Sequence, residues 1–168
     1  MKIDRQHSVA FSGYRASKLL KCLSDSDAVQ RLEQYTFEAV VSLVEQGYTT
    51  FMTGMSDGFD LLAASAVLRL KQTHQGIELV AVIPFHGQSK GYSAQDRALY
   101  DMVLAGADVT LYLSYKYISP KQYLCRNDFL VLNSSQLLCY YDGQRGGTMY
   151  TYNRAMKFGL EITNLANL

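Results

Sequence analysis

Tryptophan is absent from this chain of 168 residues, and proline, cysteine and net charge are all scarce. With two Pro and 48% apolar residues, the composition excludes a disordered or collagen-like chain. The three cysteines, Cys22, Cys125 and Cys139, are odd in number and show no C-x-x-C spacing, which argues against a disulfide framework. We therefore expect free thiols in a reducing compartment, with Cys139 as a small core residue of an apolar strand.

Membrane insertion and bulk electrostatic attraction are also disfavoured. No apolar run approaches the roughly 20 residues that span a bilayer, and no signal peptide is recognised, so we expect a cytoplasmic protein. The net charge of +1 comes from 16 Lys and Arg mixed with 15 Asp and Glu. Such a balance gives no global attraction to nucleic acid, although Lys116, Lys121, Arg126 and Arg145 leave a local basic patch open.

What the chain does contain is a regular alternation of apolar, strand-like runs with amphipathic, helix-like runs. Strands are predicted at 8–11, 49–53, 77–83, 108–113, 136–140 and 160–164, and helices at about 26–45, 61–71, 94–104, 121–133 and 149–158. Nearly continuous apolar strands suit a sheet that is buried on both faces. Residues 1–168 are therefore predicted to form one α/β domain, with a doubly wound, mostly parallel sheet and helices on both faces.

The most informative segment is 141–148, Tyr-Asp-Gly-Gln-Arg-Gly-Gly-Thr, between a predicted strand and a predicted helix. The unpaired N–H groups and the positive pole of the macrodipole at such a helix start favour a phosphate or a carboxylate. Glycines let a ligand approach the backbone closely, and Thr148 can cap the helix or donate its hydroxyl. A tight turn without a ligand is the alternative.

The loops after the other strands bring further glycine and charge to the same edge of the sheet, where open α/β folds bind ligands. Arg15 offers a planar fork for phosphate or carboxylate, and Asp60 can accept hydrogen bonds from a ribose or a base. Each feature also has a structural explanation: Arg15 as a surface residue, Asp57 and Asp60 as helix caps, and Arg126-Asn127 as a solvated helix face. The candidate ligand-binding residues are Gly13, Tyr14, Arg15, Gly54, Asp57, Gly58, Asp60, Pro84, Arg126, Asn127, Asp142, Gly146, Gly147 and Thr148.

Four segments in chain order also carry a family resemblance. They are Ser12-Gly13-Tyr14-Arg15, Gly54 to Leu61 with Ala63-Ala64, Ile83-Pro84-Phe85, and Arg126-Asn127 with Tyr141-Asp142-Gly143 and Gly146-Gly147-Thr148. This ordered set resembles the DUF1273, or YpsA-like, branch of the SLOG superfamily, which also contains DNA-processing protein A and the LOG phosphoribohydrolases. The resemblance spans nearly the whole chain and implies a Rossmann-like fold whose cleft binds a nucleotide or a nucleotide-derived ligand.

The same resemblance implies roles for individual residues. By carry-over, Gly13 and Arg15 line one side of the cleft, with Gly54, Asp57, Gly58 and Asp60 beside them, Arg126 points toward the phosphates or the sugar, and Gly146-Gly147-Thr148 receives a phosphate. The LOG enzymes carry a P-G-G-x-G-T-x-x-E motif whose glutamate takes part in N-glycosidic cleavage. Here Met149-Tyr150-Thr151 follows Thr148, so that glutamate is missing, as is the proline.

Three functional hypotheses follow from this pattern. The first is a non-catalytic domain that binds or senses a nucleotide. The second is a hydrolase of nucleoside phosphates or ribosides, which needs a positioned acid or base; Asp57, Asp60 or Asp142 could substitute for the glutamate, although nothing in the sequence selects one. The third is a DNA-associated module, by analogy with DNA-processing protein A, which the near-neutral charge disfavours.

Metal and cofactor chemistry find no support in the pattern. His7, His74 and His86 have no metal-ligand spacing, and neither a G-x-S-x-G elbow nor a P-loop is present. We therefore expect no metal and no required cofactor, and we expect a small nucleotide-like molecule as the partner. The catalytic residues, the ligand's identity and the pairing of subunits into a homo-oligomer stay open.

Overall fold

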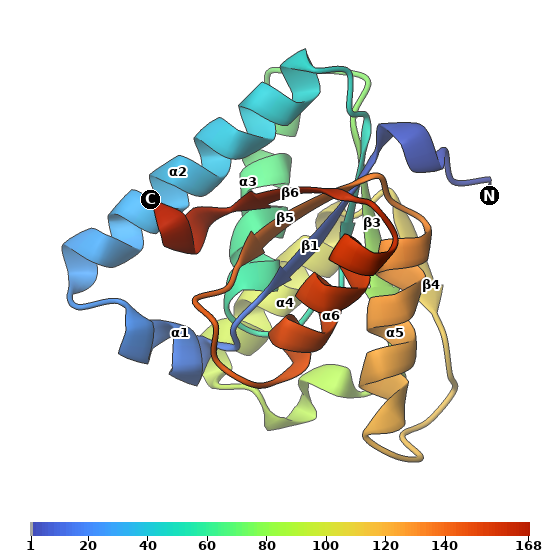
Figure 1. Ribbon diagram of the computed structural model, residues 1–168. Helices are drawn as coiled ribbons and strands as arrows, with labels where there is room; N and C mark the ends of the chain where they lie inside the picture. The colour runs from blue at the N-terminus through green and yellow to red at the C-terminus, as the bar shows by residue number, and fades with distance from the viewer. Residues whose placement is uncertain (1) are drawn as a thin grey trace.

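Six short runs rich in apolar, β-branched and aromatic residues form the strands of one sheet (Figure 1). The computed structural model describes residues 2–168. The strands are β1 (Ser8–Gly13), β2 (Thr50–Thr53), β3 (Glu78–Ile83), β4 (Val109–Tyr112), β5 (Gln136–Tyr140) and β6 (Glu161–Asn164). Their order is β4-β3-β2-β1-β5-β6 and every neighbouring pair is parallel, which confirms the predicted fold class.

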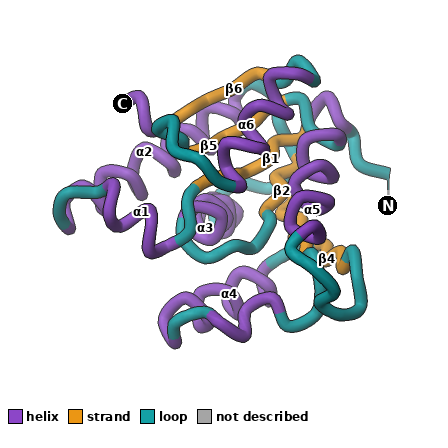
Figure 2. Tube along the Cα trace, turned by 60° about the horizontal axis from the view of Figure 1, so that its bottom comes forward, coloured by secondary structure: helices purple, strands orange, loops and turns teal. Residues whose placement is uncertain are grey.

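Helices cover both faces of this sheet (Figure 2). They are α1 (Ala16–Cys22), α2 (Ser26–Glu45), α3 (Phe59–Lys71), α4 (Ala94–Gly106), α5 (Lys121–Leu132) and α6 (Gly147–Lys157), with short 3₁₀ helices η1 (Arg5–His7), η2 (Gln88–Gly91) and η3 (Leu165–Asn167). Asp25 caps α2 by accepting from the N–H of Ala28 at 2.7 Å, and Ser93 caps α4 by accepting from the N–H of Asp96 at 3.1 Å. Within residues 2–168, no helix has both the length and the apolar character needed to cross a bilayer.

Two apolar cores lie on the two sides of the sheet. Successive side chains of β1 alternate between them: Val9 and Phe11 pack in the core that includes α2 and α3, and Ala10 packs in the core that includes α5 and α6. Cys139 of β5 is fully buried in the second core, as predicted, and burial raises the pKa of its thiol to about 12. Burial on both faces explains the nearly continuous apolar strands.

The winding of the chain reverses between β1 and β5. From β1 the chain steps outward through β2 and β3 to β4, and it then returns to the other side of β1 to form β5 and β6. The loops after β1 and β5 therefore diverge to opposite faces, which leaves a crevice at the carboxyl ends of the strands. This carboxyl edge lies at the bottom of Figure 1 and comes forward in Figure 2.

Three helix predictions need correction. The seven-residue α1 was not predicted, because it has one buried residue, Leu19, and no side-chain cap. The starts of α3 and α6 lie two residues earlier than predicted, directly after glycines of their loops. In α6 the short side chains of Thr148, Thr151 and Ala155 are buried, whereas the longer Met156 is 53% exposed.

Candidate functional site

A cleft opens at the reversal point, where the segments after β1, β2 and β5 meet the first turns of α5. Its volume of about 350 Å³ lies within the range of small-molecule sites. Its lining consists of Ser12, Gly13, Tyr14, Arg15, Ser17, Lys18, Ser56, Asp60, Tyr123, Arg126, Asn127, Arg145, Gly146, Gly147 and Thr148. The cleft thus occupies the place where open α/β sheets bind their ligands.

The N-terminus of α6 contributes to one wall of the cleft. Gly146 precedes this helix with a φ of 147°, and its position supplies no side-chain cap. The N–H of Tyr150 donates to the Gly146 carbonyl at 3.2 Å, so the N–H groups of Gly147 and Thr148 precede the first helical bond. The predicted capping role of Thr148 is wrong, because the helix begins one residue before it. Space beside Gly147 is open: a Cβ there would meet nothing nearer than the Asn127 amide at 3.9 Å.

Cationic side chains surround the mouth of the cleft. Arg15 lies 3.8 Å from the carboxylate of Asp57 and 5.0 Å from the centre of the Tyr123 ring, and about half of its side chain (49%) stays exposed. Lys18 donates to the carbonyl of Arg145 at 2.9 Å, which holds the ammonium beside the β5–α6 loop. Together these charges favour an anion at the start of α6.

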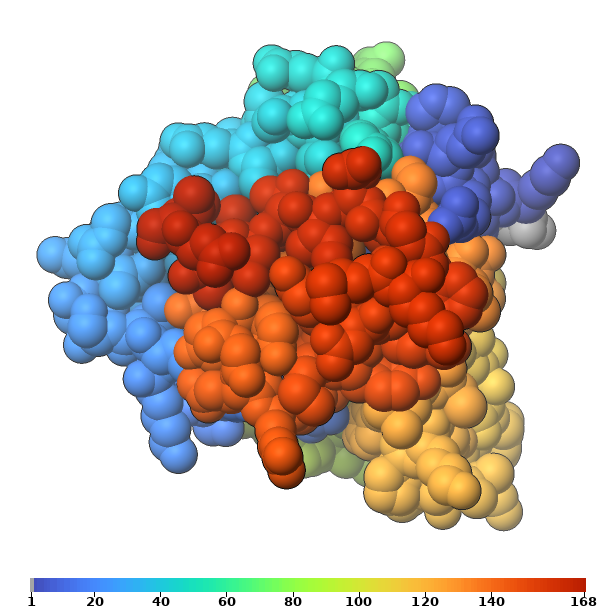
Figure 3. All heavy atoms as spheres, in the orientation of Figure 1, coloured from blue at the N-terminus to red at the C-terminus, as the bar shows by residue number. Residues whose placement is uncertain are grey.

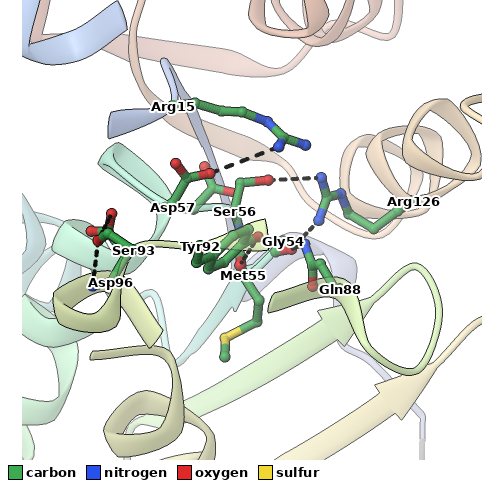
Figure 4. Close-up of polar contacts among 11 residues, drawn as sticks. Arg15, Gly54, Met55, Ser56, Asp57, Gln88, Tyr92, Ser93, Asp96 and Arg126 are labelled. Atoms are coloured by element: carbon green, nitrogen blue, oxygen red, sulfur yellow. Dashed lines mark hydrogen bonds and ion pairs between the residues drawn. The ribbon is translucent and has the colours of Figure 1, made fainter. Parts of the chain in front are cut away.

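Arg126 lies at the base of the cleft and is only 4% exposed (Figure 4). Its guanidinium donates to the carbonyl of Gly54, to Oγ of Ser56 at 3.1 Å and to Oδ1 of Asn127 at 2.8 Å. Burial lowers the pKa of Arg126, and the carboxylate of Asp60 opposes that shift. The interpretation of Arg126 as part of a solvated face is therefore wrong, because this side of α5 faces the β2–α3 loop.

Asp60 brings a buried carboxylate to the same cleft. It is 4% exposed, and its Oδ2 accepts from the N–H of Ser56 at 3.4 Å. Burial raises its pKa from 3.8 to about 6, although the charge of Arg126 opposes the rise. The predicted caps, Asp57 and Asp60, are both wrong: Gly58 occupies the capping position of α3, without a side-chain cap. Asp60 can instead accept a hydrogen bond from a ligand or exchange a proton near neutral pH.

The pH dependence of stability should reveal the buried state of Asp60. The folded protein keeps the Asp60 proton up to about pH 6, whereas the unfolded chain releases it near pH 4. The folded state binds more protons in that window, so wild-type stability falls as the pH rises through it. Asp60→Asn removes this loss, and its stability relative to wild type should rise by about 2 kcal/mol between pH 4.5 and pH 7.5. Urea unfolding at both pH values measures this, and an unchanged difference would contradict the burial of an ionisable carboxyl.

Tyr14 ties the β5–α6 loop to the end of β1. Its buried hydroxyl donates to the carboxylate of Asp142 and accepts from the N–H groups of Asp142 at 3.2 Å and Gln144 at 3.1 Å. Burial and the bond to Asp142 raise the pKa of Tyr14 to about 12, so the hydroxyl keeps its proton. The hydroxyl of Tyr14 is thus used within the protein, where it positions the loop that leads to α6.

Two glycines that were expected to admit a ligand admit other parts of the protein instead. A Cβ on Gly54 would lie 2.6 Å from the guanidinium of Arg126. Gly58 has a φ of 91°, and a Cβ there would lie 2.4 Å from the carbonyl oxygen of Tyr14. The loops after β1 and β2 can therefore pack together and seat Arg126 only because these positions lack a side chain.

The cleft brings together most, but not all, of the predicted residues. Those that line it are Gly13, Tyr14, Arg15, Asp60, Arg126, Asn127, Gly146, Gly147 and Thr148. Four predicted residues do not line the cleft: Gly54, Asp57, Gly58 and Asp142. Pro84 does not line it either, because it follows β3, which lies two strands away from β1 in the sheet. The lining residues that the prediction omitted are Ser12, Ser17, Lys18, Ser56, Tyr123 and Arg145. Lys18 belongs to α1, the helix that was not predicted. A helix there places Lys18 on the same side as Arg15.

No three His, Cys, Asp or Glu side chains gather into a cluster that could hold a metal ion anywhere in residues 2–168. The charged and dipolar groups at the cleft are its cations, the N–H groups at the start of α6 and the carboxylate of Asp60. This set can bind an anion and a hydroxyl-bearing group side by side.

Comparison with known proteins places this arrangement among relatives. The family model described as YspA SLOG family, YpsA, matches residues 9–165. A UPF0398 protein of Halalkalibacterium halodurans is 28% identical over 150 residues, which cover 89% of this chain and 79% of that protein. A UPF0398 protein of Bacillus thuringiensis is 28% identical over 158 residues, which cover 93% and 85%.

Two solved structures share the fold. DNA processing protein A of Streptococcus pneumoniae superposes with a TM-score of 0.62 at 20% identity, over 94% of this chain and 49% of that one. DNA processing protein A of Helicobacter pylori, described in a single-stranded DNA binding mode, superposes with a TM-score of 0.64 at 15% identity, over 96% and 66%. This chain therefore spans about half to two thirds of those proteins. The likeness concerns the fold.

Proposed function

This chain belongs to the YspA SLOG family, and from that premise we propose that its cleft binds a small nucleotide-like ligand. The observation that carries the proposal is the start of α6, which has no side-chain cap and borders a cavity lined by Arg15, Lys18 and Arg145. Free N–H groups, the positive end of a helix dipole and cationic side chains together favour a phosphate.

In the proposed complex the phosphate lies against Gly147 and Thr148, and the sugar lies toward Asp60. The buried carboxylate accepts a hydrogen bond from a ribose hydroxyl, and Arg126 holds the β2–α3 loop through Gly54 and Ser56. A cavity of about 350 Å³ is at the small end of ligand sites, which favours one sugar with its phosphate over an extended dinucleotide. Binding without turnover is favoured, because Thr151 stands where the LOG enzymes have their glutamate and donates to the Gly147 carbonyl at 3.0 Å.

Gly147→Asp is expected to weaken binding of a nucleoside monophosphate by at least about 100-fold, because it sets a carboxylate against the phosphate. The variant should stay folded: the site has room for a Cβ, and an acidic residue in the first helical turn complements the dipole. Calorimetric titration with nucleoside mono- and diphosphates, ADP-ribose and cyclic nucleotides measures the effect.

Gly91→Asp is the matched control, because it adds the same charge at a glycine with open space around it and outside the cleft. Its affinity for the same ligands should equal that of wild type. The proposal fails if no compound of the panel binds, or if Gly147→Asp binds as tightly as Gly91→Asp.

Hydrolysis of a nucleoside phosphate or riboside is the second candidate, and Asp60 is the observation that favours it. A carboxyl with a pKa of about 6 in a cleft has the properties of a general acid or base. Incubation with a panel of nucleoside monophosphates, followed by chromatography for the free base, tests this candidate. Base release that Asp60→Asn abolishes would establish it over simple binding.

Association with DNA is the third candidate. It is favoured by the shared fold with the Helicobacter pylori protein, whose structure is described as a single-stranded DNA binding mode. At 15% identity the similarity supports a shared fold and not a shared function. A DNA-binding surface therefore has to be recognised from the residues of this chain.

A further inference from the structure

A row of aromatic rings leads away from the cleft along the carboxyl edge. It begins at Tyr123, which lines the cleft and whose ring centre lies 5.4 Å from that of Phe85. Phe85 also contacts Tyr117, at 5.1 Å between centres. The next residue after Phe85, His86, stacks on Tyr112 with ring centres 3.9 Å apart and planes within 3°. The rings thus form a continuous track from α5 to the edge strand β4.

The outer part of this track is unusually exposed. Tyr115 is 85% exposed and Tyr117 52%, and both belong to the β4–α5 loop, as does Ile118 at 71%. The β4–α5 segment, gold in Figure 3, projects from the lower right of the molecule in that view. Large apolar groups that are exposed together in one segment mark an interaction surface.

The two segments that carry the rings are basic. The two segments that carry the rings, residues 84–95 and 109–127, contain Lys90, Lys116, Lys121 and Arg126 but no Asp or Glu. Residues 12–24 and 143–148, which border the cleft, are likewise free of acidic residues. The acidic groups at the cleft, Asp57 and Asp60, belong to the segment after β2, where Asp57 lies 3.8 Å from Arg15. The near-neutral net charge therefore does not exclude an anionic ligand along the two ring-bearing segments.

We propose that this track binds a single-stranded nucleic acid, with one phosphate at the start of α6 and the following bases on the tyrosines of the β4–α5 loop. The inference rests on the phosphate site proposed for the cleft and extends it to a longer ligand. Exposed aromatic rings offer stacking to any base, and interleaved lysines neutralise the backbone, which is how single strands are bound without sequence preference. The order Tyr115-Lys116-Tyr117 places one cation between two rings.

A single strand suits this surface better than a duplex or a protein partner. A base stacks only when it is unpaired, and the rings of the β4–α5 loop stand out from the surface rather than line a groove of duplex width. The track begins at a cleft lined by the cations Arg15, Lys18 and Arg145, which favour an anionic ligand at that end. An apolar protein surface would remove water from the half-exposed side chain of Arg15 without supplying a further anion.

Fluorescence anisotropy with labelled oligo(dT) of about 4, 8 and 12 nucleotides tests the proposal, since sites of this kind take about 4–16 nucleotides. Affinity should rise with length and fall with salt. Tyr115→Ala with Tyr117→Ala should weaken binding of the longest oligomer by at least about tenfold, because each lost stacking contact is worth about 5- to 100-fold. Lys116→Ala should reduce the slope of log K against log salt by about 0.7.

Tyr35→Ala is the matched control, because Tyr35 is a 40% exposed tyrosine of α2, far from the track in the sequence and outside the cleft lining. It should bind oligo(dT) like wild type. The proposal is overturned if the longest oligomer binds no tighter than a mononucleotide, or if the double tyrosine variant binds like Tyr35→Ala.

The cleft proposal can survive that result. It does so if Gly147→Asp loses mononucleotide binding while the double tyrosine variant keeps it. A dimer that the tyrosine variant splits, without oligonucleotide binding, would assign the track to subunit contact instead.

Discussion

Arg126→Met should lower the free energy of unfolding by about 3–5 kcal/mol at pH 8, the usual cost of removing one partner from a buried charged network. The variant leaves Ser56 Oγ without its guanidinium donor and Asp60 without the positive charge that lowers its pKa. Methionine keeps an unbranched apolar stem but ends near the start of the guanidinium, so the loss includes both the hydrogen bonds and the space that the guanidinium fills. Urea denaturation of wild type and variant determines the difference.

The same variant should become more sensitive to pH. Without Arg126, the pKa of Asp60 rises further above its value of about 6. A carboxyl whose folded-state pKa is raised costs nothing while it is protonated, and it destabilises the fold as the pH rises through that pKa. The deficit of Arg126→Met relative to wild type should therefore be larger at pH 8 than at pH 5.5.

Arg154→Met provides the comparison. Arg154 pairs with Asp128 at 2.8 Å, but both side chains are about 30% exposed, so solvent screens the pair. The expected loss is about 1 kcal/mol, with little change between pH 5.5 and pH 8. Equal losses for the two variants would show that Arg126 is solvated in solution and would remove the base of the described cleft.

Gly58→Ala should cost at least about 3 kcal/mol, the second large effect. The φ of 91° at Gly58 is strained for alanine, and the added methyl would lie 2.4 Å from the Tyr14 carbonyl oxygen and 2.6 Å from the Ala16 nitrogen. Both contacts are with backbone, which cannot rotate away as a side chain would. The loops after β1 and β2 must then separate, so ligand binding in the cleft should fall together with the unfolding midpoint.

Gly76→Ala isolates the backbone term. Gly76 has a φ of 84°, close to that of Gly58, but nothing lies within 4 Å of the position its Cβ would take. We expect a loss of about 1 kcal/mol from the positive φ alone. The excess of Gly58→Ala over Gly76→Ala, read from thermal or urea unfolding, measures how tightly the two loops pack. The absence of any excess would contradict that packing.

The fold was predictable because its signals are local and repeated. Each strand is a short apolar run, and the caps of α2 and α4 at Asp25 and Ser93 can be recognised from the residues around them. Alternation of these elements then restricts the sheet to a parallel order with helices on both faces. Two of the incorrect predictions also have local causes. Helix α1, with seven residues, is too short to show a helical repeat of apolar residues, and α6 is preceded by a glycine and not by a capping side chain.

For the candidate site, the topology of the sheet predicts the position but not the orientation of the side chains. Parallel strands bring their following loops to one edge, so Arg15, Asp60 and Gly147 could be expected to meet there, and they do. Topology does not state which side chains turn inward. A solvated Arg126 is compatible with the sequence, yet Arg126 is buried. No sequence motif marks Tyr123, which joins the cleft to the aromatic track.

The amino-acid order by itself determined the sheet, its winding and the edge where a ligand would bind, because these depend on hydrophobic period and chain connectivity. The tertiary structure alone decided the electrostatics of that edge. Burial raises the pKa of Asp60 to about 6, the β2–α3 loop holds Arg126 inside, and β4 and α5 place the exposed tyrosines beside the cleft. Burial and nearby charges depend on the distances between residues that are far apart in the chain. The order of the amino acids alone does not give those distances.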